Sequence, residues 1–69
     1  MSIIEKLFEK LESDSYLECP SYDIYREDCA YEVYYGKKAK MRSFKDFVSL
    51  ANWIQERPKK LKELEEEMV

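Results

Sequence analysis

The sequence predicts an α+β domain made of an N-terminal helix, a three-stranded antiparallel meander, a C-terminal helix and a short last helix that starts at a proline. Apolar residues recur at helical spacing near both ends of the chain, whereas the middle alternates with period two and is rich in tyrosine. Proteins divide into several domains only well beyond 69 residues, so residues 1–69 are expected to form one domain.

The first helix is predicted from an apolar face near the N-terminus. Ser2 precedes this face and Glu5 follows three residues later, a spacing that allows each residue to hydrogen-bond the backbone amide of the other. The polar segment 13–15 is expected to end the helix. The residues of the apolar face are Ile3, Ile4, Leu7, Phe8 and Leu11.

Three strands are predicted where the side chains alternate with period two and tyrosine, valine and isoleucine are frequent. The strands are expected at residues 22–26, 30–35 and 39–42. Residues 16–19 are expected to be an edge strand or an extended lead-in, because Pro20 follows them and cannot donate a hydrogen bond within a sheet.

Two hairpin turns are expected between these strands. Gly36–Lys37 forms the second turn, because glycine accepts a positive φ without steric cost. Glu27–Asp28 forms the first turn. On the strands, alternation is expected to place Tyr34 on the outward face of the sheet together with Lys40 and Arg42.

A second helix is predicted after the strands. Ser43 followed by Asp46 repeats the capping pattern, and the helix is expected to end near Arg57, since Pro58 lacks an amide hydrogen. Pro58 is tolerated in the first turn of a helix, so it is expected to begin the short last one. The apolar stripe of this last helix is Leu61, Leu64 and Met68.

We expect the first and third helical segments to pack on one face of the sheet, which gives a two-layered domain. This arrangement buries each predicted apolar face in a single core. The expected core consists of Ile3, Leu7, Phe8, Leu11, Ile24, Tyr31, Val33, Met41, Phe44, Phe47, Val48, Ala51 and Ile54.

Some apolar residues are left over by this core, and a homodimer is their expected use. A chain of this size gains little stability from its own core alone, so a partner chain is the expected addition. The expected dimer contact consists of Trp53, Leu61, Leu64 and Met68.

The composition indicates that the chain is not an enzyme. It contains no histidine, the commonest general base and metal ligand, and its single glycine excludes a glycine-rich phosphate loop. Cys19 and Cys29 stand in no catalytic motif and are expected to be reduced thiols. We expect no catalytic residue and no cofactor, and a zinc site would need ligands from two chains.

No apolar stretch approaches the length of a membrane-spanning helix, and the N-terminal run is too short and too acidic for a secretory signal. The sequence therefore predicts a cytoplasmic protein without a membrane partner.

Charge is distributed unevenly along the chain, whose net charge is -3. Residues 1–35 carry nine acidic and three basic side chains, residues 36–60 carry eight basic and two acidic ones, and residues 61–69 are acidic again. The basic and the acidic segments are therefore separate candidates for binding a partner.

The basic segment suggests a nucleic-acid surface. Sheets often bind single strands with basic groups that contact phosphates beside aromatic rings that stack on bases. Lysines on an exposed strand also prevent aggregation between sheets, and the negative net charge counts against nucleic acid. The residues of this surface are Tyr25, Tyr34, Lys38, Lys40 and Arg42.

Two other features suggest a protein partner. The six tyrosines exceed what one small core can use, and exposed tyrosines commonly anchor protein contacts. The acidic residues of the first half either solubilise the chain or attract a basic groove, as a protein imitating nucleic acid would. These acidic residues are Glu9, Glu12, Asp14, Glu18, Asp23, Glu27 and Asp28.

The segment from YEVYYGKKAKMRSF, which starts at Tyr31, to Trp53 and Ile54 is expected to form a hairpin that runs into a capped helix. In style it resembles segments of many short accessory proteins of phages and mobile elements. The resemblance implies a small regulatory protein that binds a host macromolecule and blocks or redirects it.

We therefore expect a non-enzymatic protein–protein interaction module, such as a phage-like inhibitor or adaptor. The alternative is a nucleic-acid-binding module that uses the lysines, the arginine and the tyrosines of the sheet.

Overall fold

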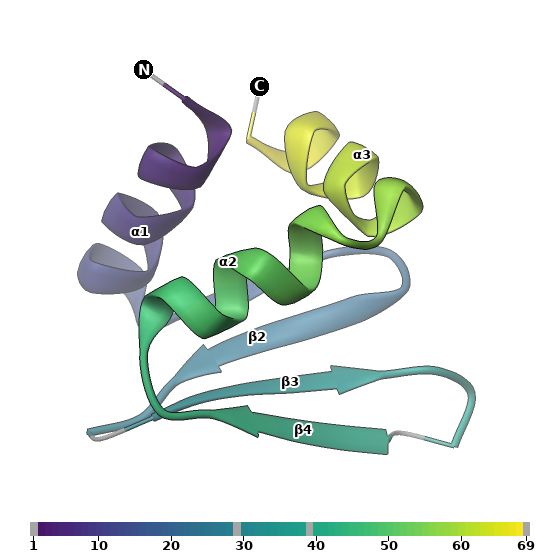
Figure 1. Ribbon diagram of the computed structural model, residues 1–69, viewed down its shortest axis with the longest axis horizontal. Helices are drawn as coiled ribbons and strands as arrows, with labels where there is room; N and C mark the ends of the chain where they lie inside the picture. Colours follow the sequence, from purple (N-terminus) through teal and green to yellow (C-terminus); the bar gives the residue numbers. More distant parts are fainter. Residues whose placement is uncertain (1, 29, 39, 69) are drawn as a thin grey trace.

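A computed structural model describes residues 2–28, 30–38 and 40–68 of the chain (Figure 1). The predicted α+β class is confirmed, with one helix before a sheet and two helices after it. The elements in chain order are α1 (Ile3–Asp14), β1 (Tyr16–Glu18), β2 (Tyr22–Arg26), β3 (Tyr31–Tyr35), β4 (Lys40–Phe44), α2 (Phe47–Gln55) and α3 (Pro58–Glu67).

Helix α1 begins after Ser2 and ends at the polar segment as predicted, and of the two capping hydrogen bonds expected between Ser2 and Glu5 the structure shows the one from the Glu5 amide. The Glu5 amide donates to the Ser2 hydroxyl at 3.2 Å, and Leu7 and Leu11 are fully buried on the apolar face. Ser15 ends the helix in the left-handed conformation with φ 67°, and its amide donates to the Leu11 carbonyl at 3.0 Å. These local signals are sufficient because capping and amphipathic spacing depend only on near neighbours.

The sheet has four antiparallel strands in the order β1-β2-β3-β4, so the expected count of three is wrong. The additional strand is β1, in the segment expected to be an edge strand or a lead-in. Leu17 pairs with Ile24 of β2 and is buried, which stabilises β1 although it has only three residues. Pro20 lies after the strand and therefore removes none of its hydrogen bonds.

The two predicted turns lie where the sequence places them. Gly36 has φ 76° in the turn between β3 and β4. In the first turn, the Glu27 amide donates to the Ala30 carbonyl at 2.8 Å. Cys29 and Ala39 lie outside the described residues.

Strand β4 extends further than expected, and the cap of α2 shifts with it. Phe44 pairs with Tyr31 and is buried, so Ser43 belongs to the strand and does not cap the helix. Asp46 is the cap, since its carboxylate accepts from the Ser49 amide at 2.8 Å. The cause is the burial of Phe44, which extends the strand beyond its expected end at residue 42.

All three helices lie on one face of the sheet (Figure 1). Helix α3 packs on α2, and the Tyr22 hydroxyl donates to the Lys60 carbonyl at 2.8 Å. Glu63 accepts hydrogen bonds from the amide and the hydroxyl of Ser21, which also attach α3 to the sheet. The structure therefore has two layers, one of helices and one of strands, and none of the helices among the described residues lies on the outer face of the sheet.

Most of the expected core is confirmed. The prediction is wrong for Phe8, Met41 and Val48, whose exposed fractions are 42%, 51% and 67%. Phe8 lies at the rim of the core against Phe47, with ring centroids 5.0 Å apart, and Met41 lies on the outer face of the sheet. The buried expected residues are Leu7, Leu11, Ile24, Val33, Phe44, Ala51 and Ile54, and Ile3, Tyr31 and Phe47 are partly buried against them.

The residues expected to be left over for a dimer belong to the core instead. Trp53 is 5% exposed and Leu64 is fully buried, while Leu61 and Met68 pack against the buried cluster. The chain uses these side chains to dock α3 on its own helical layer. The structure therefore removes the reason for a dimer contact at these positions, and dimerisation itself stays a prediction.

Candidate binding face of the sheet

The register of the strands decides which side chains share the outer face. Directly paired residues of an antiparallel sheet lie on the same face, and alternate residues along a strand do so too. Leu17, Ile24 and Val33 face the helices, so their neighbours along the strands face outward. We define the open face as Tyr16, Glu18, Asp23, Tyr25, Glu32, Tyr34, Met41 and Ser43.

Large apolar and aromatic groups remain accessible on the open face. Tyr16 is 49% exposed and Met41 is 51% exposed, and Tyr25 and Tyr34 are partly exposed between them. The helices lie on the opposite side of the sheet (Figure 1). The open face is therefore an aromatic surface that the helical layer leaves uncovered.

Three tyrosines form a continuous stripe across β1, β2 and β3. The Tyr16 and Tyr25 rings are stacked with centroids 6.4 Å apart, and the Tyr25 and Tyr34 rings meet edge to face at 5.6 Å. These separations lie within the range of favourable aromatic pairs. The stripe holds the rings in a defined arrangement, which lowers the conformational entropy that a contact would cost.

Acidic side chains border this stripe. A hollow of about 500 Å³ opens on the outer face, with Tyr25 and Tyr34 as its aromatic walls. Glu27, just beyond the end of β2, adds a carboxyl group to those supplied by the strands. The carboxyl groups that line the hollow belong to Asp23, Glu27 and Glu32.

Tyr34 is coupled to its acidic neighbour Glu32. The Tyr34 hydroxyl donates to Glu32 Oε1 at 3.2 Å. The negative charge of Glu32 raises the pKa of the Tyr34 phenol above its ordinary value of 10.0, and the hydrogen bond raises it further. The phenol is thereby kept protonated, as a neutral donor beside a carboxylate.

The structure separates the basic residues from the tyrosines that they were expected to join. Lys40 pairs with Tyr35 and Arg42 pairs with Val33, which places both on the face of the sheet that carries the helices. Met41 is the residue opposite Tyr34. The expected shared face is therefore wrong, because Lys40 and Arg42 alternate in phase with the buried Phe44.

The other residues expected to contact a partner, Tyr25, Tyr34 and Lys38, also do not all lie on one face. Tyr25 and Tyr34 lie together on the open face, as the alternation within their strands indicates. Lys38 is exposed in the turn at the end of the β3–β4 hairpin. The open face thus receives the two tyrosines without Lys40 or Arg42.

On the helical side, cations lie over aromatic rings. The Arg57 guanidinium lies 4.4 Å from the centroid of the Trp53 ring and donates to the Trp53 carbonyl at 2.9 Å. The Lys60 ammonium lies 5.2 Å from the Tyr22 ring centroid. Burial of Trp53 leaves its indole N–H without an acceptor among the described residues. Arg57 and Trp53 are four residues apart on the chain, whereas the contact of Lys60 with Tyr22 joins distant segments and has no local sequence signal.

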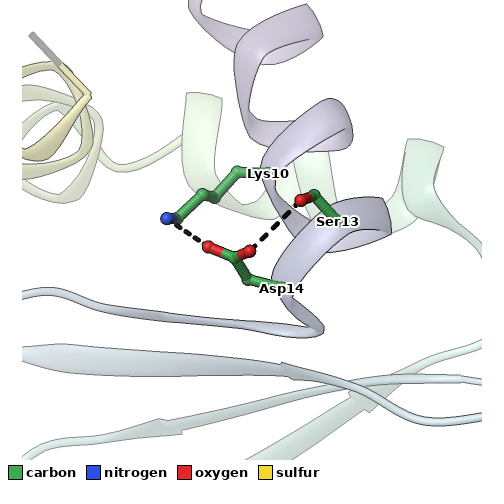
Figure 2. A network of polar contacts seen from close by, with 3 residues as sticks. All are labelled: Lys10, Ser13 and Asp14. Atoms are coloured by element: carbon green, nitrogen blue, oxygen red, sulfur yellow. Dashed lines mark hydrogen bonds and ion pairs between the residues drawn. The ribbon is translucent and has the colours of Figure 1, made fainter.

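Part of the acidic surface is neutralised within the chain. Figure 2 shows Lys10 paired with Asp14, whose carboxylate also accepts from the Ser13 hydroxyl at 3.2 Å. These two contacts hold the pKa of Asp14 below its ordinary value. Oε2 of Glu12 lies 3.4 Å from Nη2 of Arg26. Two acidic residues of α1, Glu12 and Asp14, are thus paired with basic side chains.

The thiol of Cys19 is buried beside β1, and burial raises its pKa to about 11. A thiol with a raised pKa is protonated at neutral pH, which disfavours nucleophilic attack. Among residues 2–28, 30–38 and 40–68, no group of three or more cysteine or acidic side chains is placed to hold a metal ion.

In the described part of the chain, no helix combines the length and the apolar character needed to cross a membrane. Comparisons of the chain with protein-family models, with curated proteins and with solved structures found no match.

Proposed function

We propose that the chain is a non-enzymatic protein-binding module that docks its open face onto a basic, extended segment of a partner protein. The observation that carries the proposal is the tyrosine stripe, which crosses three strands on an uncovered sheet face and is bordered by carboxyl groups. Each part of this surface favours the same class of partner.

The aromatic part favours protein contact. Tyrosine offers a large, rigid surface with a polar end, and it is enriched among residues that dominate binding energy. Tyr16, Tyr25 and Tyr34 are already arranged by their strands, and Met41 extends the apolar surface across β4. A contact that covers this stripe would remove it from water without reorganising the sheet.

The charge of the open face favours a basic partner. The charged groups that line the hollow at Tyr25 and Tyr34 are carboxyl groups, while Lys40 and Arg42 of the neighbouring strand lie on the other face of the sheet. Complementary charge increases the rate of association and selects against acidic partners. Nucleic acid would meet these carboxyl groups with like charge, so the nucleic-acid hypothesis loses the surface that supported it.

Binding through one face is compatible with action as an inhibitor or adaptor that blocks or redirects its partner. The raised pKa of the Cys19 thiol disfavours this thiol as a nucleophile. The cytoplasmic location stays a prediction.

The proposal is tested by titrating the full chain with three labelled probes and following fluorescence anisotropy. The probes are a short unstructured basic peptide, an acidic peptide of the same length and a single-stranded DNA. We expect the basic peptide alone to bind, with an affinity that falls as salt is raised, because exposed charges are screened.

Two variants distinguish the open face from the rest of the surface. Changing Tyr16, Tyr25 and Tyr34 together to serine should abolish binding of the basic peptide. Val48→Ser is the matched control, since Val48 is 67% exposed on α2 and away from the open face. Binding that survives the triple change, or DNA binding that depends on Lys38 and Lys40, would refute the proposal.

A further inference from the structure

We infer that the corner between the Tyr25 and Tyr34 rings is a recognition site for an arginine side chain of the partner segment. The inference rests on the proposed function and adds the side chain that the open face selects. It is carried by the hollow in which the two rings and three carboxyl groups meet.

The two rings form an aromatic corner. Their planes are inclined at 80° and their centroids are 5.6 Å apart. A cation is attracted to the face of an aromatic ring when it lies within about 6 Å of the centroid. A planar guanidinium that stacks on one ring in this corner also comes close to the other.

The carboxyl groups favour a guanidinium over an ammonium. Arginine presents a rigid fork of donors that bonds a carboxylate through two parallel hydrogen bonds, whereas lysine offers a compact charge. Asp23 and Glu32 lie directly opposite Tyr34 and Tyr25 in the sheet, so each ring has a carboxyl group beside it. The Tyr34 hydroxyl donates to one lone pair of Glu32 Oε1 and leaves the second lone pair of Oε1 and the whole of Oε2 to accept from a guanidinium.

The same chain contains an example of this stacking. The Arg57 guanidinium lies 4.4 Å from the Trp53 centroid on the helical side, where it is held by its own hydrogen bond to the backbone. The corner at Tyr25 and Tyr34 offers a comparable ring surface with carboxyl acceptors in place of the carbonyl. A guanidinium from another chain would find both elements there.

The test compares three peptides of the same length. In each of them serine alternates with one other residue, which is arginine in the first peptide, lysine in the second and citrulline in the third. Citrulline keeps the shape of arginine but carries no charge. We expect the arginine peptide to bind about tenfold more tightly than the citrulline peptide, and measurably more tightly than the lysine peptide. The readouts are the Kd and the NMR shifts of the Tyr25 and Tyr34 ring protons.

Glu32→Gln should remove the preference for arginine over lysine and retain residual binding, because the tyrosine stripe remains. Glu65→Gln on α3 is the matched control and should leave the preference unchanged. Equal binding of arginine and lysine peptides through the open face would overturn this inference and leave the proposed function standing. Absence of binding by every basic peptide would overturn both.

Discussion

Tyr34 is the residue at which the aromatic and acidic parts of the open face meet. Its hydroxyl donates to Glu32, whose charge raises the pKa of the phenol above 10.0. Since the raised pKa favours the protonated form in the folded state, the contribution to stability is complete below pH 10.0 and is lost as the pH rises through the folded-state pKa.

Glu32→Gln should therefore lower the pKa of Tyr34 towards 10.0 and shift its alkaline transition to lower pH. The pKa is measured by following the Tyr34 ring protons by NMR as the pH is raised. A pKa of Tyr34 that does not fall in the variant would show that Glu32 does not control this phenol.

Residue patterns along the sequence predicted Tyr25 and Tyr34 correctly as outward side chains, because alternation within one strand is a local property. The same patterns placed Lys40 and Arg42 on the wrong face of the sheet. The register between two strands decides which of their side chains share a face, and a single strand does not reveal it. The available signal was Phe44, which lies two residues from Arg42 and is buried. The expected strand ended at residue 42 and therefore did not include Phe44.

At the scale of elements, Ser15 shows that a helix end carries strain. It ends α1 with φ 67°, a conformation that residues with a side chain adopt at a cost, while its carbonyl accepts from the Arg26 amide at 2.7 Å. Ser15 is the residue that connects α1 to β1, and its hydrogen bond with Arg26 attaches this connection to β2.

Ser15→Gly should raise the free energy of unfolding by about 0.5 kcal/mol, because relief of the left-handed strain exceeds the added entropy of glycine in the unfolded chain. Ser15→Ala is the control and should bring no gain, since alanine keeps the Cβ atom. Urea unfolding of the three proteins measures the effect. A loss of stability in Ser15→Gly would contradict the role assigned to this backbone conformation.

The helices and the missing strand show which elements a sequence specifies locally. Helix α1 and the proline start of α3 were predicted from caps and spacing, which involve neighbours along the chain. Strand β1 was not counted because its three residues carry little pattern of their own. It exists through pairing with β2 and through burial of Leu17, both of which are tertiary effects.

At the scale of the whole molecule, α3 completes the core of a single chain. Leu64 is fully buried, so Leu64→Ala should reduce the free energy of unfolding by about 2–5 kcal/mol. Glu65→Ala on the exposed side of the same helix should have little effect. Thermal unfolding followed by circular dichroism measures both changes.

The same experiment tests whether α3 serves a dimer. If Leu64 stabilises only its own chain, the Tm of the unaltered protein should be independent of protein concentration. A Tm that rises with concentration, and loses this dependence in Leu64→Ala, would instead assign α3 to a contact between copies.

The separation of the two faces of the sheet is the molecular basis of the proposed function. The helices occupy one face and leave the tyrosines and carboxyl groups on the other (Figure 1). Because Lys40 and Arg42 lie on the helical side of β4, the open face is acidic although the neighbouring sequence is basic. The location of a bound partner is therefore the decisive observation.

The most direct measurement is an NMR map of the full chain during titration with the arginine-containing peptide. We predict that the largest shifts occur at Tyr16, Tyr25 and Tyr34, and that α2 and α3 change little. Shifts confined to the helices or to Lys40 and Arg42, or no shifts at all, would contradict the assignment of binding to the open face.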